Sequence, residues 1–156
     1  MGRFCCCCRC CSKYNKKQVM MIAAAENGSV LNKTSKRLKK DKEVVLIAVK
    51  QNGRSLEYAF KGLKRDKEVV SMAVTMDGWA LAHASKELQN DVDVVMLAIL
   101  QNGEALKYAS KELRNDKEVV TKAVSQNYRA MEYASKKLQN DDEIKMIFKK
   151  SHGTWH

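Results

Sequence analysis

The residues best suited to chemistry stand together at the N-terminal end of the sequence. They are Gly2, directly after the initial methionine, and all six cysteines of the chain: Cys5, Cys6, Cys7, Cys8, Cys10 and Cys11. A glycine at position two is the first requirement for N-myristoylation, and neighbouring cysteine thiols are acceptors for S-acylation. The myristoylation motif has Ser or Thr at position six, where this chain has cysteine, so the match is partial. The pattern predicts a lipid anchor that holds the chain to a membrane surface.

Other interpretations of the cysteine run stay open. Zinc sites use separated cysteine pairs, and four consecutive cysteines cannot all face one ion, so a Cu(I) cluster is the remaining metal alternative. A run without a role is the third alternative. The string is similar to that of cysteine-string membrane proteins, which favours the lipid anchor. Residues 12–156 contain no cysteine, so no disulfide can join the fold. This distribution indicates a reducing cytoplasm, with the anchored chain on the cytosolic face of a membrane.

The net charge of +11 is concentrated near the N-terminus. Residues 1–40 carry ten Lys or Arg and one acidic residue, a net of +9, which leaves only +2 for residues 41–156. An array with so little net charge lacks the basic stripe expected of a nucleic-acid groove. A basic segment at one end instead suits an anionic membrane surface. The alternative is a nucleic-acid-associated protein that binds through this N-terminal segment, with salt-sensitive affinity.

A repeat of 25 residues organises the rest of the chain. Four copies begin with aspartate and span residues 41–65, 66–90, 91–115 and 116–140, after a degenerate copy at 16–40 and before a partial copy at 141–156. Each copy predicts two short helices, the first capped by its aspartate and the second carrying a stripe such as Leu56, Ala59 and Leu63. The predicted fold is therefore an all-α solenoid of stacked antiparallel helix pairs over 16–156, preceded by a disordered, cysteine-rich basic segment at 1–15.

The Asn-Gly pair between the two helices predicts a left-handed turn at the glycine, as at Gly53 and Gly103. Tyr128 occupies this position in the copy 116–140. A bulky residue in the left-handed region strains the backbone, so replacing Tyr128 with glycine is expected to stabilise the protein.

The repeat pattern D-x-E-V-V-x-x-A-V-x-x-N-G-x-A-L-x-Y-A-S-x-x-L-x-x-D resembles the repeats of domain of unknown function 4116. The resemblance covers about residues 16–153 and departs from the pattern at Tyr128 and at Asp77, which replaces asparagine. It implies a helical repeat protein and provides no catalytic residue, metal ligand or cofactor. The chain also lacks a glycine-rich phosphate loop and a nucleophile placed beside a base, so the sequence predicts no enzyme.

One helix departs from the polar outer surface of the other copies. Val92, Met96 and Leu100 form an i, i+4, i+8 line off the core stripe, and Trp79 is expected near the same turn end. Apolar residues at positions that are polar in other copies predict an exposed contact site for an unknown protein partner or a second copy of the chain. Burial by the terminal copies is the alternative.

A second recurring feature is aromatic. Tyr58, His83, Tyr108 and Tyr133 share one position of the repeat and predict a ladder along the rod, which we interpret as packing between copies.

Overall fold

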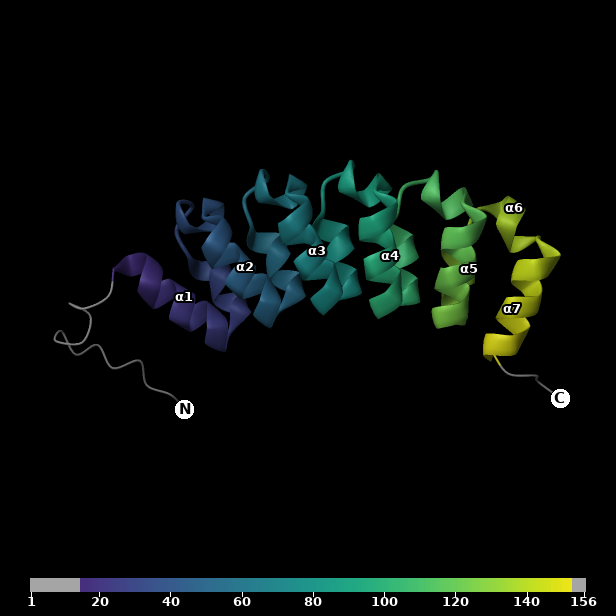
Figure 1. The fold of residues 1–156 in the computed structure, drawn as a ribbon, viewed down its shortest axis with the longest axis horizontal. Helices are drawn as coiled ribbons and strands as arrows, with labels where there is room; N and C mark the ends of the chain where they lie inside the picture. The colour runs from purple at the N-terminus through teal and green to yellow at the C-terminus, as the bar shows by residue number, and fades with distance from the viewer. Residues whose placement is uncertain (1–14, 153–156) are drawn as a thin grey trace.

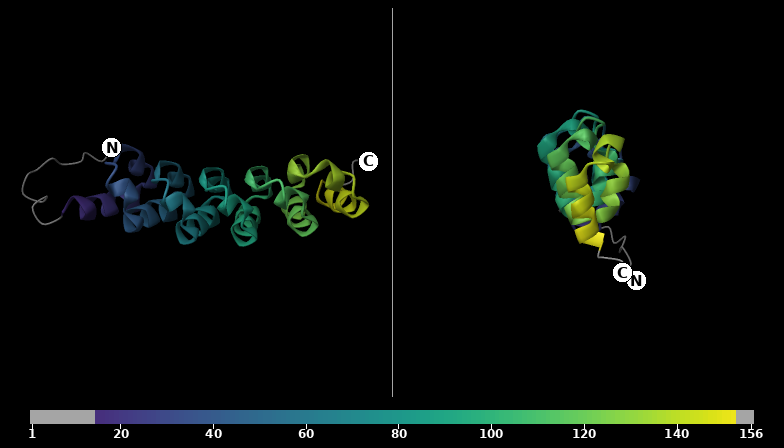
Figure 2. Two further views of the ribbon diagram at one scale, coloured as in Figure 1. Left: turned by 90° about the horizontal axis from the view of Figure 1, so that it is seen from above. Right: turned by 90° about the vertical axis from the view of Figure 1, so that its right-hand side faces the viewer.

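The computed structural model describes residues 15–152, and all regular secondary structure in that part of the chain is helical. Successive copies of the repeat stack along the long axis of an extended rod (Figure 1). The α-helices form one row of this rod and shorter 3₁₀ helices form the other (Figure 2). The predicted all-α solenoid is therefore confirmed. We number its layers from one, at residues 16–40, to six, which begins at residue 141.

The first row consists of α-helices, six of them one to a layer. They are α1 (Lys16–Glu26), α2 (Lys42–Gln51), α3 (Lys67–Met76), α4 (Val92–Gln101), α5 (Lys117–Gln126) and α7 (Asp142–His152), while the short α6 (Lys136–Gln139) lies in the second row of layer five. The predicted aspartate caps are present, since the Asp41 carboxylate accepts the amide hydrogens of Glu43 and Val44, and Asp66 and Asp91 do the same in their layers. Each cap satisfies amides of the first helical turn that have no partner within the helix.

The first layer differs from the prediction by one residue. The degenerate copy begins at Lys16, where the other copies have their capping aspartate, but Asn15 caps α1 through a reciprocal pair of hydrogen bonds with Gln18 at 2.9 Å. Asn15 was expected in the disordered segment, and this was wrong. The rest of that segment, residues 1–14, lies outside the described residues.

The second half of each copy is not the single α-helix that the sequence predicted. It folds as two 3₁₀ pieces per layer: η1 (Gly28–Lys33) and η2 (Leu38–Lys40), η3 (Gly53–Tyr58) and η4 (Leu63–Arg65), η5 (Gly78–His83) and η6 (Leu88–Asn90), and η7 (Gly103–Tyr108) and η8 (Leu113–Asn115). Layer five has η9 (Tyr128–Tyr133) followed by α6. Ala59 of the predicted stripe lies outside both pieces, because η3 ends at Tyr58 and η4 begins at Leu63. Residues 59–62 separate the two pieces of layer two, and the first of them, Ala59, is extended.

The core runs between the two rows. The apolar positions of α2, namely Val44, Val45, Ala48 and Val49, are completely buried, and the equivalent residues of α3 and α4 are buried in the same way. A completely buried leucine of the second row closes the core in layers one to four: Leu31, Leu56, Leu81 and Leu106. Because a short helix is only marginally stable alone, each layer depends on its neighbours for the surface that it buries.

The glycines between the rows do not adopt the predicted left-handed turn. Asn52 before Gly53 is extended, and Gly53 begins the right-handed η3. Glycine is required there because a Cβ atom would collide with a carbonyl of the next layer. At Gly78 that atom would lie 2.5 Å from the Ala98 oxygen, and Gly53 and Gly103 meet the oxygens of Ala73 and Ala123 in the same way. The backbones of neighbouring layers therefore touch where a side chain would hold them apart.

Tyr128 replaces this glycine where the stack ends, and the strain predicted for it does not arise. It begins the right-handed η9, and its ring meets Phe148 of α7 edge-on, with ring centroids 5.9 Å apart. Edge-to-face aromatic pairs are favourable. The premise of the predicted stabilisation by glycine, a left-handed backbone at Tyr128, is therefore not met, and the tyrosine contributes a contact between the last two layers.

One backbone hydrogen bond joins the second row of each layer to the layer before it. The Ser85 amide donates to the Lys64 carbonyl, Ser110 to Gln89, and Ser135 to Arg114, each at 2.9 Å, and Phe60 donates to Lys39 at 3.0 Å. The loops of the second row are thereby held at a fixed step along one edge of the rod.

Candidate protein-binding face

A ladder of ion pairs runs along the row of α-helices from one layer to the next. The second residue of four copies is a lysine that reaches forward to two carboxylates: the Lys42 ammonium lies 2.7 Å from both Asp66 and Glu68. Lys17, Lys67 and Lys117 make the equivalent pairs with the first and third residues of the following copy. The hydrogen bond from Lys42 lowers the pKa of Asp66 from its ordinary value. Sequence reasoning missed this ladder, although a lysine followed 24 and 26 residues later by acidic residues was a visible signal.

The ladder is interrupted at layer four, where Val92 replaces the lysine. Asp116 and Glu118 of layer five therefore have no basic group within 4.0 Å among the residues that the structure describes. Asp116 is exposed and accepts one amide hydrogen of α5, from Val119 at 3.0 Å. A valine in water beside two uncompensated carboxylates contributes nothing evident to the fold itself.

The other residues of the predicted contact line differ in exposure. Val92 and Leu100 are 50% and 54% exposed, as expected. Met96 is half-buried against the core, so the prediction that it would be substantially exposed was wrong. Met96 lines a shallow hollow of about 690 Å³ beside α5. The other residues that line it are Thr121, Ser125, the carboxylates Glu118 and Glu143, and the lysines Lys117 and Lys122. The line is thus an apolar strip with a carboxylate at its border.

Trp79 does not join this line. It is half-buried in the second row, and its ring meets Tyr108 of the next layer edge-on with centroids 5.7 Å apart. Its open side lines a separate hollow of about 340 Å³ with Met76, Gln101 and Asn102. The expectation of an exposed Trp79 beside the line was therefore wrong, because its ring is used in packing between layers.

The apolar surface of the α-helical row extends beyond α4. The seventh residue of the copies is apolar from layer one to layer four: Ile22, Ile47, Met72 and Leu97. Ile22 is 52% exposed and Met72 is 36% exposed, whereas the other two are half-buried. In α5 this position is the exposed Lys122, so the apolar strip ends beside Val92, Met96 and Leu100. Sequence reasoning assigned no role to these residues because an apolar residue that recurs in four successive copies resembles a core position.

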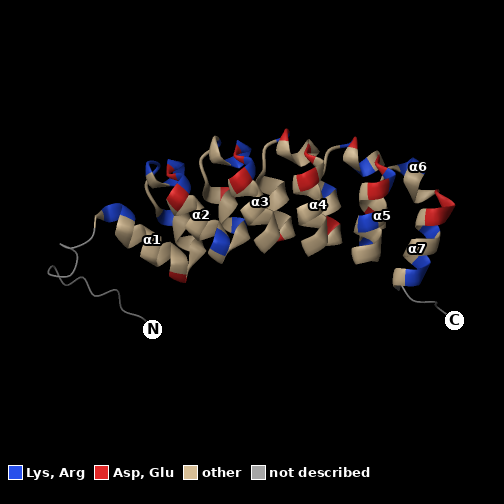
Figure 3. Cartoon of the chain, viewed as in Figure 1, with Lys and Arg blue, Asp and Glu red and all other residues tan. Residues whose placement is uncertain are grey.

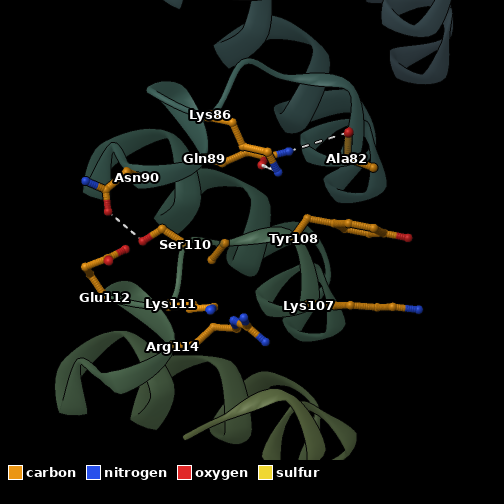
Figure 4. Close-up of a pocket in the computed structure, with 11 residues that line it drawn as sticks. Ala82, Lys86, Gln89, Asn90, Lys107, Tyr108, Ser110, Lys111, Glu112 and Arg114 are labelled. Carbon is orange, nitrogen blue, oxygen red and sulfur yellow. Dashed lines mark hydrogen bonds between the residues drawn. The ribbon is translucent and has the colours of Figure 1, made fainter.

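Hollows also separate the loops of the second row. The hollow between layers three and four, of about 660 Å³, is lined by Lys86, Lys111 and Arg114 around Tyr108 (Figure 4). The side-chain Nε of Arg114 is buried there without a hydrogen-bond partner. Lys39, Lys64, Gln89 and Gln139 occupy the same repeat position and donate to backbone carbonyls of their own layers. Arg114 therefore departs from the pattern of its position.

The aromatic ladder is part of this row. Tyr58, Tyr108 and Tyr133 are half-buried and pack against the core, in agreement with the packing interpretation. His83 occupies the same position, and its partial burial lowers the pKa of the imidazole.

The other predicted sites lie elsewhere in the chain or have no counterpart. Gly2 and the six cysteines lie outside the described residues. Within residues 15–151, no group of three or more His, Cys, Asp and Glu side chains is arranged to hold a metal ion. No helix of the described chain has the length and apolar character needed to cross a membrane.

Comparison with known proteins agrees with the architecture. The family described as domain of unknown function (DUF4116) matches residues 16–64, 66–114 and 116–155. Each of the first two matches covers two of the 25-residue copies, so the family unit corresponds to a pair of layers. No curated protein and no solved structure showed significant similarity to the chain. With three tandem matches over most of its length, the chain belongs to the DUF4116 family.

Proposed function

We propose that this protein is a non-catalytic helical-repeat scaffold that binds another protein through its α-helical row and is tethered to a membrane surface by N-terminal acylation. The observation that supports binding is the interruption of the ion-pair ladder at Val92. At that point an exposed apolar side chain replaces a lysine, and the carboxylates of Asp116 and Glu118 lose their basic partner. A partner that presents an apolar segment beside a basic residue would cover Val92 with the segment and neutralise the carboxylates of Asp116 and Glu118 with the basic residue.

The energetic argument concerns solvent exposure. Covering Val92 and Leu100 recovers about 1–2 kcal/mol for each side chain, from which the entropy of association must be subtracted. Met96 suits the centre of such a surface because its flexible side chain adapts to irregular partners. The proposed interface therefore combines an apolar strip with electrostatic selection for a basic partner.

The double substitution Val92→Lys with Leu100→Thr tests the binding face. Both new residues occur at the same positions in other copies, as Lys67 and Thr75, so the fold should accept them. The restored ladder should leave the melting temperature unchanged or slightly higher, since exposed ion pairs contribute about 0–1 kcal/mol. We expect the variant to lose at least about tenfold in affinity for proteins that the native chain captures from a eukaryotic lysate.

The matched control is Met146→Thr, which removes a side chain that is 58% exposed on the terminal helix α7. This control should keep its binding partners. Equal binding by the native protein and the double variant would overturn the proposal. Sedimentation of the purified chain separates a foreign partner from self-association, because a second copy on this face would give a dimer that the double variant loses.

The tether requires a separate experiment. In a eukaryotic cytosol we expect fatty acylation at Gly2 and at one or more of the six cysteines, because one acyl chain alone gives only weak membrane binding. Mass spectrometry of the N-terminal peptide identifies these groups, and hydroxylamine should release the protein from membranes by cleaving thioesters. Free thiols together with an unmodified Gly2 in cells would contradict the tether. Salt-sensitive nucleic-acid binding that disappears on deleting residues 1–40 would instead favour the nucleic-acid alternative.

A further inference from the structure

A concentration of positive charge follows the loop edge of the first two layers. The last seven residues of successive copies carry net charges of +4 at 34–40 and +3 at 59–65, but 0 at 84–90, +1 at 109–115 and +2 at 134–140. We define the basic ridge as the six side chains Lys36, Arg37, Lys39, Lys40, Lys61 and Lys64. In Figure 3, blue basic residues gather over the loops of layers one and two, with red acidic residues beside them.

The carboxylates at this edge do not neutralise the ridge. Asp41 and Asp66 are engaged by Lys17 and Lys42 of the ladder. No acidic side chain lies within 4.0 Å of a ridge cation among the described residues. Lys39 and Lys64 donate instead to the backbone carbonyls of Asn32 and Glu57, at 2.8 and 2.7 Å. Lys39 and Lys64 are half-buried, and the nearby charge of Glu57 acts on Lys64 without forming a close ion pair.

An aromatic side chain stands in the middle of the ridge. Phe60 is 47% exposed and occupies a position that is serine in the other four copies. In layers four and five this serine donates to an asparagine of the preceding layer, as Ser135 does to Asn115 at 2.7 Å. In layer two the same contact is made by Phe60 and Lys40, whose ammonium lies 4.4 Å from the ring centroid. A polar contact between layers has been replaced by an exposed aromatic ring with a cation over it.

A basic hollow adjoins the ridge. It has a volume of about 700 Å³ and is lined by Lys61, Lys64, Arg65 and Lys86. One carboxylate, Glu87, also lines it and lies 3.3 Å from Arg65. The described chain begins at the same edge, because Lys17 of the first turn of α1 is paired with Asp41 at 2.9 Å. The N-terminal segment therefore joins the rod beside the ridge.

We infer that the basic ridge and Phe60 form a docking surface for a bilayer rich in anionic phospholipids. Lysine side chains attract the negative surface, and an aromatic ring with a cation beside it suits the boundary between headgroups and acyl chains. The turn tips of two adjacent layers present this chemistry on an outer edge, where a flat surface can reach all of it. This site deepens the proposed membrane tether but does not depend on acylation, since it belongs to the folded repeats.

The test uses the full chain without acyl groups and with its thiols reduced. Its binding is measured to vesicles of pure phosphatidylcholine and to vesicles in which about 30% of the lipid is phosphatidylserine. The charge variant Lys39→Gln with Lys64→Gln keeps the fold, because Gln139 at the same position donates to the Glu132 carbonyl at 3.1 Å. Each basic residue near an anionic surface contributes about fivefold in affinity, so the loss of two should weaken binding about 25-fold. Affinity should fall further as the salt concentration rises.

A second variant removes the aromatic contact. Lys40→Asn with Phe60→Ser restores the serine–asparagine pair of layers four and five and should lower the affinity by more than about fivefold. The control Lys136→Gln with Lys137→Gln removes two exposed charges from layer five and should change the affinity by less than about twofold.

Three results would overturn the inference. The first is a control that loses as much affinity as the ridge variants, which would mean that total charge alone is responsible. The second is equal binding to vesicles without phosphatidylserine. The third is displacement of the protein from vesicles by single-stranded RNA, together with an equal loss of RNA affinity in both ridge variants. That result would make the ridge a nucleic-acid surface. None of these results bears on acylation or on the α-helical face, so failure here leaves the proposed function untouched.

Discussion

Replacing Gly78 with alanine is expected to lower the free energy of unfolding by about 3 kcal/mol. The added methyl group would lie 2.5 Å from the Ala98 carbonyl oxygen and 3.3 Å from the Asn102 amide nitrogen. Both are backbone atoms of the next layer, so the contact cannot be relieved by rotating a side chain. Layers three and four would have to separate, and both would lose buried apolar surface. Denaturant unfolding followed by circular dichroism measures the loss.

The control for this substitution is Gly62→Ala. Gly62 has a φ of −61°, and an added methyl group would meet only the Phe60 ring at 3.7 Å. Alanine there should leave the stability unchanged or raise it by about 0.4–1 kcal/mol, because it lowers the conformational entropy of the unfolded chain. Similar losses for the two variants would show that close approach of the layers is not the reason for glycine at position 78.

The second large effect is expected from Leu81→Ala, at about 2–5 kcal/mol. Leu81 is completely buried between layers, and its truncation leaves a cavity that neighbouring backbones cannot fill. Met131 occupies the same repeat position in layer five, where it is only half-buried. Met131→Ala should therefore cost less than half as much. Calorimetric melting of the two variants provides the comparison, and equal costs would contradict a core that weakens toward the end of the rod.

The aspartate caps and the buried stripe were predictable because they depend on neighbours within one helix. Asp41, for example, needs only the amides of its own first turn, and Val44 to Val49 show their buried face through spacing alone. The 3₁₀ form of the second row was not predictable in the same way. The spacing of Leu56, Ala59 and Leu63 predicts one face of a helix, and it does not reveal that the backbone becomes extended at Ala59.

Features that depend on the distance between layers escaped prediction. The sequence predicted a left-handed turn at Gly53 because glycine commonly ends a helix in that conformation. Glycine is instead required by the carbonyl oxygen of Ala73, 20 residues away in the next layer. The candidate face was found only in part for the same reason. Val92 and Leu100 were visible as departures from the other copies, but the packing of Trp79 against Tyr108 requires the spacing of two layers.

The bonds between layers also bear on how such a chain can change its length. The lysine ladder, the glycine contact and the loop hydrogen bond each join a copy to its immediate neighbour and to nothing farther away. A gene segment that encodes a whole layer can therefore be duplicated or deleted while every junction keeps the same partners. An insertion of any other length shifts the register at once and separates lysine from carboxylate and glycine from carbonyl. Insertions and deletions that preserve these contacts are thereby limited to complete layers.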